Sequence, residues 1–285
     1  MSEPLTDSLF PTVTICSVNK VSRKKLKAIL ESSPKLQGIS YELVLQALRY
    51  LAKIDESNKQ ESDLRNISQV IKSHNISTEE LVHILSQTSP SCDELIIDCL
   101  WKSSEMKCGQ LFSPRPTDDG ICCSFYNQRS QSDSGELQGF GFHAGLRIVL
   151  DSNLDDYSIT TSTFDGFKVL LHGANDFPDV GERGFIVGPG SEVFVALTAE
   201  TMVSTDAVSR IPLKKRQCHV TGERQLNFFN NYTSAGCLVE CTILKIIEQC
   251  QCQPFYFQGT TVTKVKFLDE LGHVLQRNLP FNILN

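Results

Sequence analysis

The sequence has no long hydrophobic run and no familiar catalytic motif. No stretch reaches the roughly 18 apolar residues of a membrane helix, and residues 1–9 lack both the basic and the apolar region of a secretory signal peptide. The six histidines form no HExxH pair, and neither a GxSxG elbow nor a Walker loop occurs. We therefore predict that the chain is not an enzyme, needs no cofactor, and has any membrane anchor outside it, as part of a longer protein.

Positive charge is also scarce. With 27 Lys and Arg against 33 Asp and Glu, the formal net charge is −6, which argues against a nucleic-acid partner because phosphate binding needs a basic face. The basic clusters at residues 23–27 and 214–216 are interpreted as solvated surface. The pairs Asp118-Asp119 and Asp155-Asp156 are interpreted as loop or strand-end residues, not as catalytic carboxylates.

Cysteine, by contrast, is abundant. Eleven cysteines lie in two groups on either side of a cysteine-free middle, which is unusual for a cytosolic protein and indicates an extracellular, disulfide-stabilised domain. Three glycosylation sequons point to the same compartment. They begin at Asn66, Asn75 and Asn231.

The six cysteines of the first group leave their pairing open. Cys122 and Cys123 are adjacent, and their side chains diverge in an extended strand, so each needs a distant partner on its own face. Six cysteines allow 15 pairings, and the sequence alone does not choose among them.

The second group forms a ladder in the segment AGCLVECTILKIIEQCQC. On a helix, Cys237 and Cys241 fall on one face, with Leu244 and Ile247 along nearly the same side. A disulfide ladder, a metal site and buried reduced thiols are all open interpretations. Zinc is the least favoured, because Cys250 and Cys252 do not complete two knuckles of the usual spacing.

The two halves of the chain differ in their hydrophobic period. Residues 10–17 have strand composition, residues 39–51 have a helical apolar stripe, and the capping box STEE predicts a helix beginning near Thr78. After residue 145, short β-branched runs separated by Gly, Pro, Asp and Asn predict strands, including a hairpin across Gly188-Pro189-Gly190. The fold class is therefore α+β, disulfide-rich.

Several blocks, taken in order, resemble a known family: FPTVTIC, WKSSEMKC, TDDGICCSF, GLRIVLDSNLDDY, GFIVGPGSEVFVAL, KKRQC and the cysteine ladder. Together they resemble the extracellular domain of the degenerin/epithelial sodium channel family, and its insect pickpocket branch in particular. Members of this family are trimeric, amiloride-sensitive cation channels in which two membrane helices flank a large, hand-shaped ectodomain. The resemblance covers roughly residues 10–257.

The resemblance implies an organisation around a mixed β-sheet palm and β-ball, with an inserted helical finger and the start of a helical thumb. The implied regions are the first palm strand in residues 1–17, the finger with its cysteine cluster in 18–128, the β-ball and palm strands in 129–217, the thumb start in 218–257 and a divergent tail in 258–285.

The resemblance also implies the cysteine pairs. In relatives, the palm cysteine bonds the one in the block TDDGICCSF, which gives Cys16 with Cys122, and the finger pair gives Cys99 with Cys108. The pickpocket branch carries two further cysteines, which gives Cys92 with Cys123. The thumb cysteines bond partners further downstream in the family, so we expect unpaired thiols at Cys218, Cys237, Cys241, Cys250 and Cys252.

The resemblance implies the extracellular part of a ligand-, proton- or force-gated sodium channel subunit at the plasma membrane, with other channel subunits as partners. Because both membrane helices and the pore have no counterpart in these residues, we expect a truncated subunit. The alternative is a secreted or retained binding module that modulates full-length subunits without conducting ions.

Overall fold

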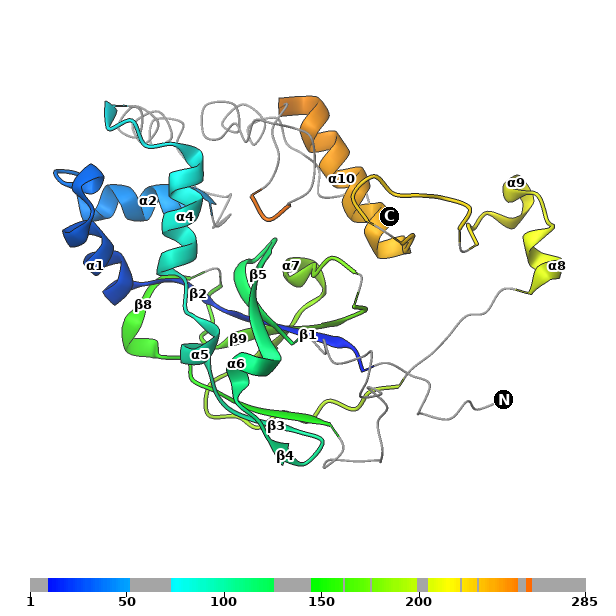
Figure 1. Cartoon of the computed structure of the whole chain (residues 1–285), viewed down its shortest axis with the longest axis horizontal. Coiled ribbons are helices and arrows are strands. Elements are labelled where there is room, and N and C mark those ends of the chain that lie inside the picture. Colours follow the sequence, from blue (N-terminus) through cyan, green and yellow to red (C-terminus); the bar gives the residue numbers. More distant parts are fainter. Residues whose placement is uncertain are drawn as a thin grey trace.

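The chain combines an antiparallel sheet with helices, and this confirms the α+β prediction. In Figure 1 the helices α1 (Arg23–Ser32), α2 (Tyr41–Leu51) and α4 (Thr78–Thr88) form a lobe beside the sheet, and the long helix α10 (Ser234–Cys250) lies apart from that lobe. The computed structural model describes residues 10–51, 73–125, 145–160, 162–174, 176–198, 205–220, 222–229, 231–250 and 255–257.

The main sheet has five antiparallel strands in the order β10, β9, β1, β6, β5. The first strand of the chain is therefore central, between two strands that come much later in the sequence. The strands are β1 (Thr12–Ser17), β5 (Phe112–Thr117), β6 (Gly120–Phe125), β9 (Phe167–His172) and β10 (Phe185–Val187).

Strand β1 is buried along its whole length, as expected for a central strand with both faces covered. Val13 and Ile15 pack with Phe125 in one hydrophobic cluster. Cys16 packs on the other face with Leu170. The predicted alternation of this strand is confirmed.

Two smaller antiparallel sheets extend the structure. The predicted strand runs at residues 145–150, 156–163, 166–172 and 184–188 each contain an observed strand. One sheet pairs β2 (Asn19–Ser22) with β8 (Tyr157–Thr160), and the other contains β3 (Ile96–Trp101), β4 (Ser104–Glu105) and β7 (Leu146–Leu150).

The helical lobe has its own core. Leu26 of α1, Leu48 of α2 and Leu81 of α4 are buried together, with Val21 of β2 joining the lobe to the sheet. The predicted capping box is present, because the Ser77 hydroxyl accepts from the amide of Glu80 while the Glu80 carboxylate accepts from the amide of Ser77. The predicted helix start at Thr78 is confirmed.

Helix α10 confirms the predicted helix of the cysteine ladder. Its buried Glu240 accepts hydrogen bonds from the backbone amides of Asn227 and Phe228, which fastens the preceding segment to the helix. In the part of the chain that the structure describes, no helix has the length and apolar character needed to cross a bilayer. Shorter elements complete the chain: η2 (Pro34–Leu36), α5 (Cys92–Leu95), α6 (Cys108–Leu111), η4 (Leu154–Asp156), α7 (Val180–Arg183), α8 (Asp206–Ser209) and α9 (Leu213–Arg216).

The predicted hairpin after β10 is wrong in its second strand. The turn itself forms, with Gly190 at a φ of +70° and the Ser191 hydroxyl donating to the carbonyl of Gly188. Residues 191–198, however, form no strand, and Phe194 is 67% exposed. A β-branched and aromatic run becomes a strand only when another strand pairs with it, and no described strand does so here.

Candidate functional site

Three disulfides join described cysteines, and they are the pairs that the resemblance implies. Cys16 and Cys122 have Cα atoms 4.5 Å apart and link the neighbouring strands β1 and β6. The two other bonds fasten short helices to strands, with Cα separations of 5.6 Å and 5.5 Å. These bonds are Cys92–Cys123 and Cys99–Cys108.

The adjacent cysteines of β6 face opposite sides of the sheet. Cys122 belongs to the cluster that contains Cys16 and Val180, whereas Cys123 belongs to the cluster that contains Cys92 and Phe125. One strand thus anchors covalent bonds on both faces, as the sequence predicted for adjacent cysteines.

Three cysteines of the second group, Cys218, Cys237 and Cys241, are free thiols. Cys218 and Cys241 are exposed and Cys237 is half-buried. Burial raises the pKa of the neighbouring Tyr232 phenol, and the nearby Cys237 thiol acts in the same direction. Cys250 ends α10, and Cys252 lies outside the described residues.

Alkylation of the native protein should separate the two groups of cysteines. We expect iodoacetamide to label Cys218 and Cys241 rapidly and Cys237 more slowly, because only the first two are exposed. Mass spectrometry of the digested protein would locate the label. A reduced and denatured sample is the control in which every cysteine reacts. Labelling of Cys16 or Cys122 in the native protein would contradict the pairing.

A charged turn between β5 and β6 organises the centre of the molecule. The Asp119 carboxylate accepts from Lys20 Nζ at 2.6 Å and from Lys168 Nζ at 2.8 Å, and Lys20 and Asp119 are only 3% and 6% exposed. Lys20 also donates to the carbonyl of Ser17 at 2.6 Å. Burial lowers the pKa of the Lys20 ammonium, and the Asp119 charge opposes this. The turn is therefore joined to β9 through Lys168 and to β2 through Lys20.

The neighbouring Asp118 holds α7 in place. Its two carboxylate oxygens accept from the amides of Val180 and Gly181, both at 2.8 Å. A Cβ at residue 181 would lie 2.6 Å from Asp118 Oδ2, so a larger residue there would displace this carboxylate. Asp118 and Asp119 are turn residues, as interpreted from the sequence. In the fold, however, they join this turn to three other elements: Asp118 to α7, and Asp119 to β2 and β9. The buried ion pair of Lys20 and Asp119 has no local sequence signal.

A buried hydrogen-bond chain crosses three strands on the sheet. His172 Nδ1 lies 2.8 Å from the carbonyl of Gly173, which can only accept, so Nδ1 carries the proton. His172 Nε2 therefore accepts from the Thr14 hydroxyl at 2.9 Å, and Thr14 in turn accepts from the hydroxyl of Ser124 at 2.8 Å. Burial lowers the pKa of His172. The imidazole is thus held neutral.

The depressed pKa of His172 predicts a loss of stability in mild acid. The folded state binds the proton less readily than the unfolded chain, whose histidine pKa is 6.5. The stabilisation is therefore complete above pH 6.5 and is lost as the pH falls from there through the lower folded-state pKa, with a slope of at most about 1.4 kcal/mol per pH unit. Denaturant unfolding at several pH values measures the slope. His172→Gln should flatten it, and an unchanged slope in that variant would contradict this assignment.

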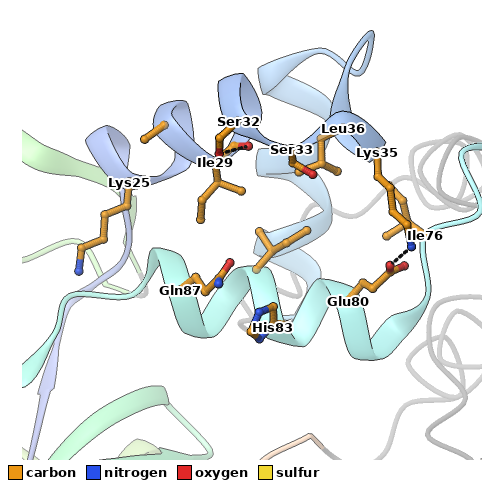
Figure 2. A pocket seen from close by; sticks show the side chains of 12 residues that line it. Lys25, Ile29, Ser32, Ser33, Lys35, Leu36, Ile76, Glu80, His83 and Gln87 are labelled. Atoms are coloured by element: carbon orange, nitrogen blue, oxygen red, sulfur yellow. Dashed lines mark hydrogen bonds and ion pairs between the residues drawn. The ribbon is translucent and has the colours of Figure 1, made fainter.

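A groove of about 640 Å³ opens between α1, η2 and α4 in the helical lobe. Figure 2 shows Ile29 reaching from α1 toward α4, and Lys35 paired with Glu80 at one end. Lys25 stands at the other end, where it is paired with Glu94. This volume is within the range of small-molecule pockets, and the groove has charged pairs at both ends.

Two of the three predicted glycosylation residues lie at the surface. Asn75 and Asn231 are exposed, so a glycan has room at both, and Asn66 lies outside the described residues. Among the described residues, no three His, Cys, Asp or Glu side chains gather in a geometry that would hold a metal ion.

The three disulfides and the packed α+β core define the class of protein as a disulfide-stabilised α+β domain. Domains of this kind are typical of oxidising compartments. The model of the amiloride-sensitive sodium channel family matches residues 2–274, and the chain belongs to this family.

Three relatives show the breadth of the similarity. The sodium channel protein Nach of Drosophila ananassae is 26% identical over 263 residues, covering 91% of this chain and 50% of that protein. Pickpocket protein 11 of Drosophila melanogaster is 30% identical over 191 residues, covering 66% of this chain and 34% of that protein. Human acid-sensing ion channel 2 is 26% identical over 262 residues, covering 88% and 48%. The chain thus spans half or less of the length of these three relatives.

Proposed function

We propose that these residues form the extracellular part of a subunit of an amiloride-sensitive sodium channel, and so serve sodium ion transport. The observation that carries this proposal is the family match over residues 2–274, in a chain whose cysteines form buried disulfides. In this role the chain receives a stimulus, which is a ligand, a proton or a force, and the pore lies in other segments of the subunit.

Under this proposal, the regions of the fold correspond to the named regions of the family's ectodomain. The first palm strand is in residues 1–17, the finger in 18–128, the β-ball and palm strands in 129–217, and the thumb begins in 218–257. The separate helical lobe and the separate helix α10 support this division, because each has its own buried core. The groove between α1 and α4 then lies in the finger.

The proposed partners are other channel subunits, in a trimer, at the outer side of the plasma membrane. Glycans on Asn75 and Asn231 fit this location, since both side chains are exposed. The thiols of Cys218, Cys237 and Cys241 are available for bonds to cysteines beyond the described residues.

Surface staining tests the extracellular assignment. Antibodies raised against the folded chain should stain intact, unpermeabilised cells of the source organism, and peptide N-glycosidase should increase the gel mobility of the stained protein. An antibody against a cytosolic protein is the control for membrane integrity. Staining that needs permeabilisation, together with unchanged mobility, would contradict the proposal.

A further inference from the structure

Three consecutive aromatic residues, Phe255, Tyr256 and Phe257, lie between the helical lobe, the sheet and α10. Phe255 packs against the core of the helical lobe. Phe257 is buried in a different cluster, together with Ile243 of α10 and Phe177. In Figure 1 this short orange segment passes between α4 and α10, close to α7.

Phe257 is the centre of an aromatic cluster. Its ring centroid lies 5.3 Å from Phe228, 5.6 Å from Phe177 and 5.8 Å from Phe229. Phe177 also lies 5.7 Å from Tyr256. These separations are within the range of favourable aromatic pairs.

Phe177 connects this cluster to the sheet, because it follows strand β9. It lies in the loop between β9 and α7, where its carbonyl accepts from the amide of Asp179 at 3.0 Å. Three residues after Phe177, the amide of Val180 donates a hydrogen bond to Asp118 of the charged turn. The aromatic contact of Phe177 is therefore made beside a segment that hydrogen bonds to the turn between β5 and β6.

None of the side chains of α10 that the structure describes is joined covalently to the rest of the fold. Cys237 and Cys241 are free, and Leu238 and Leu244 on its outer surface are 49% and 44% exposed. The sheet, in contrast, is fastened by disulfides and by buried ion pairs. The seating of α10 thus depends on the cluster around Phe257, because no disulfide between described cysteines reaches this helix.

We propose that residues 255–257 form a clasp that seats α10 against both the sheet and the helical lobe. When Phe257 leaves Phe177, α10 moves as a unit with residues 226–229, because Glu240 keeps that segment on the helix. The disulfide-bonded sheet keeps its shape. The clasp is a conformational device of this fold and holds whether or not the chain serves a channel.

A distance measurement between spin labels tests the clasp. One label is placed on the exposed Cys241 of α10 and the other on Val149→Cys, at an exposed position of β7. Replacing Cys218, Cys237, Cys250 and Cys252 with serine confines labelling to these two positions. Pulsed electron paramagnetic resonance then reports how tightly α10 is positioned relative to the sheet.

We expect a narrow distance distribution in this parent protein and a broad one in both Phe177→Ala and Phe257→Ala. The double variant should broaden by less than the sum of the two single effects, because the two residues share the contact between Phe177 and Phe257. Amide exchange near Ile243 should rise by about two- to tenfold, the factor expected for the loss of one aromatic pair. Exchange in β1 should stay unchanged.

Leu244→Ala is the matched control, since it removes an exposed apolar side chain from the same helix. Its distribution should equal that of the parent. The clasp is refuted by unchanged distributions in both alanine variants, by equal broadening in Leu244→Ala, or by faster exchange in β1. Where Phe177→Ala does not fold, Phe177→Leu replaces it, with intermediate broadening expected and no broadening counting against the clasp.

Discussion

Replacing Asp119 with asparagine is expected to lower the free energy of unfolding by about 3–5 kcal/mol, the usual cost of removing one partner from a buried ion pair. The carboxylate serves two ammonium groups, and Lys20 is buried with only the carbonyl of Ser17 as a further acceptor. Without the negative charge, Lys20 either stays charged in a buried site or loses its proton. Denaturant unfolding at pH 7 measures the loss.

Two further variants make the Asp119 result specific. Adding Lys20→Met to Asp119→Asn should recover part of the loss, because the stranded buried charge is removed. Lys35→Met breaks the ion pair of Lys35 with Glu80, whose side chains are 66% and 36% exposed, and should cost less than about 1 kcal/mol. Equal losses in Asp119→Asn and Lys35→Met would show that the buried network contributes no more than a surface pair.

Removing the bond between Cys16 and Cys122 should have the second large effect. The bond closes a loop with a sequence separation of 106, and the chain-entropy model gives about 4–5 kcal/mol for a loop of that size. The bond between Cys99 and Cys108 spans a separation of only 9 and should contribute about 2.5–3 kcal/mol. Paired alanine variants of each bond, unfolded in denaturant, give the comparison.

The order of these two losses is the informative result. Both bonds are in the same chain, so a difference between the two losses of stability cannot come from compartment or oxidant. A larger loss for the short loop would contradict the entropic account and would indicate that local packing around Cys99 dominates.

Elements with local signals were predictable from the sequence. The capping box fixed the start of α4, the alternation of Val13 and Ile15 predicted a strand, and the i and i+4 spacing of Cys237 and Cys241 predicted one helix face. In each of these elements the interactions that decide the structure are formed within a few residues.

Features made by distant residues were not predictable. Lys20 and Asp119 are 99 positions apart, and neither has a neighbour in the sequence that marks it as buried. The same holds for Phe177 and Phe257, which read as ordinary apolar residues until the fold brings them together. Residues 191–198 show the converse, because a strand-like composition does not supply a partner strand.

The most direct test of the channel assignment is a current measurement on a chimera. Residues 10–257 would replace the matching part of human acid-sensing ion channel 2, to which this chain is 26% identical. Surface biotinylation would establish that the chimera reaches the membrane, and a Cys16→Ala/Cys122→Ala version would serve as the misfolding control. We predict a sodium current that amiloride blocks and that the control lacks. A chimera that reaches the surface in normal amounts but gives no amiloride-blocked current would contradict the assignment.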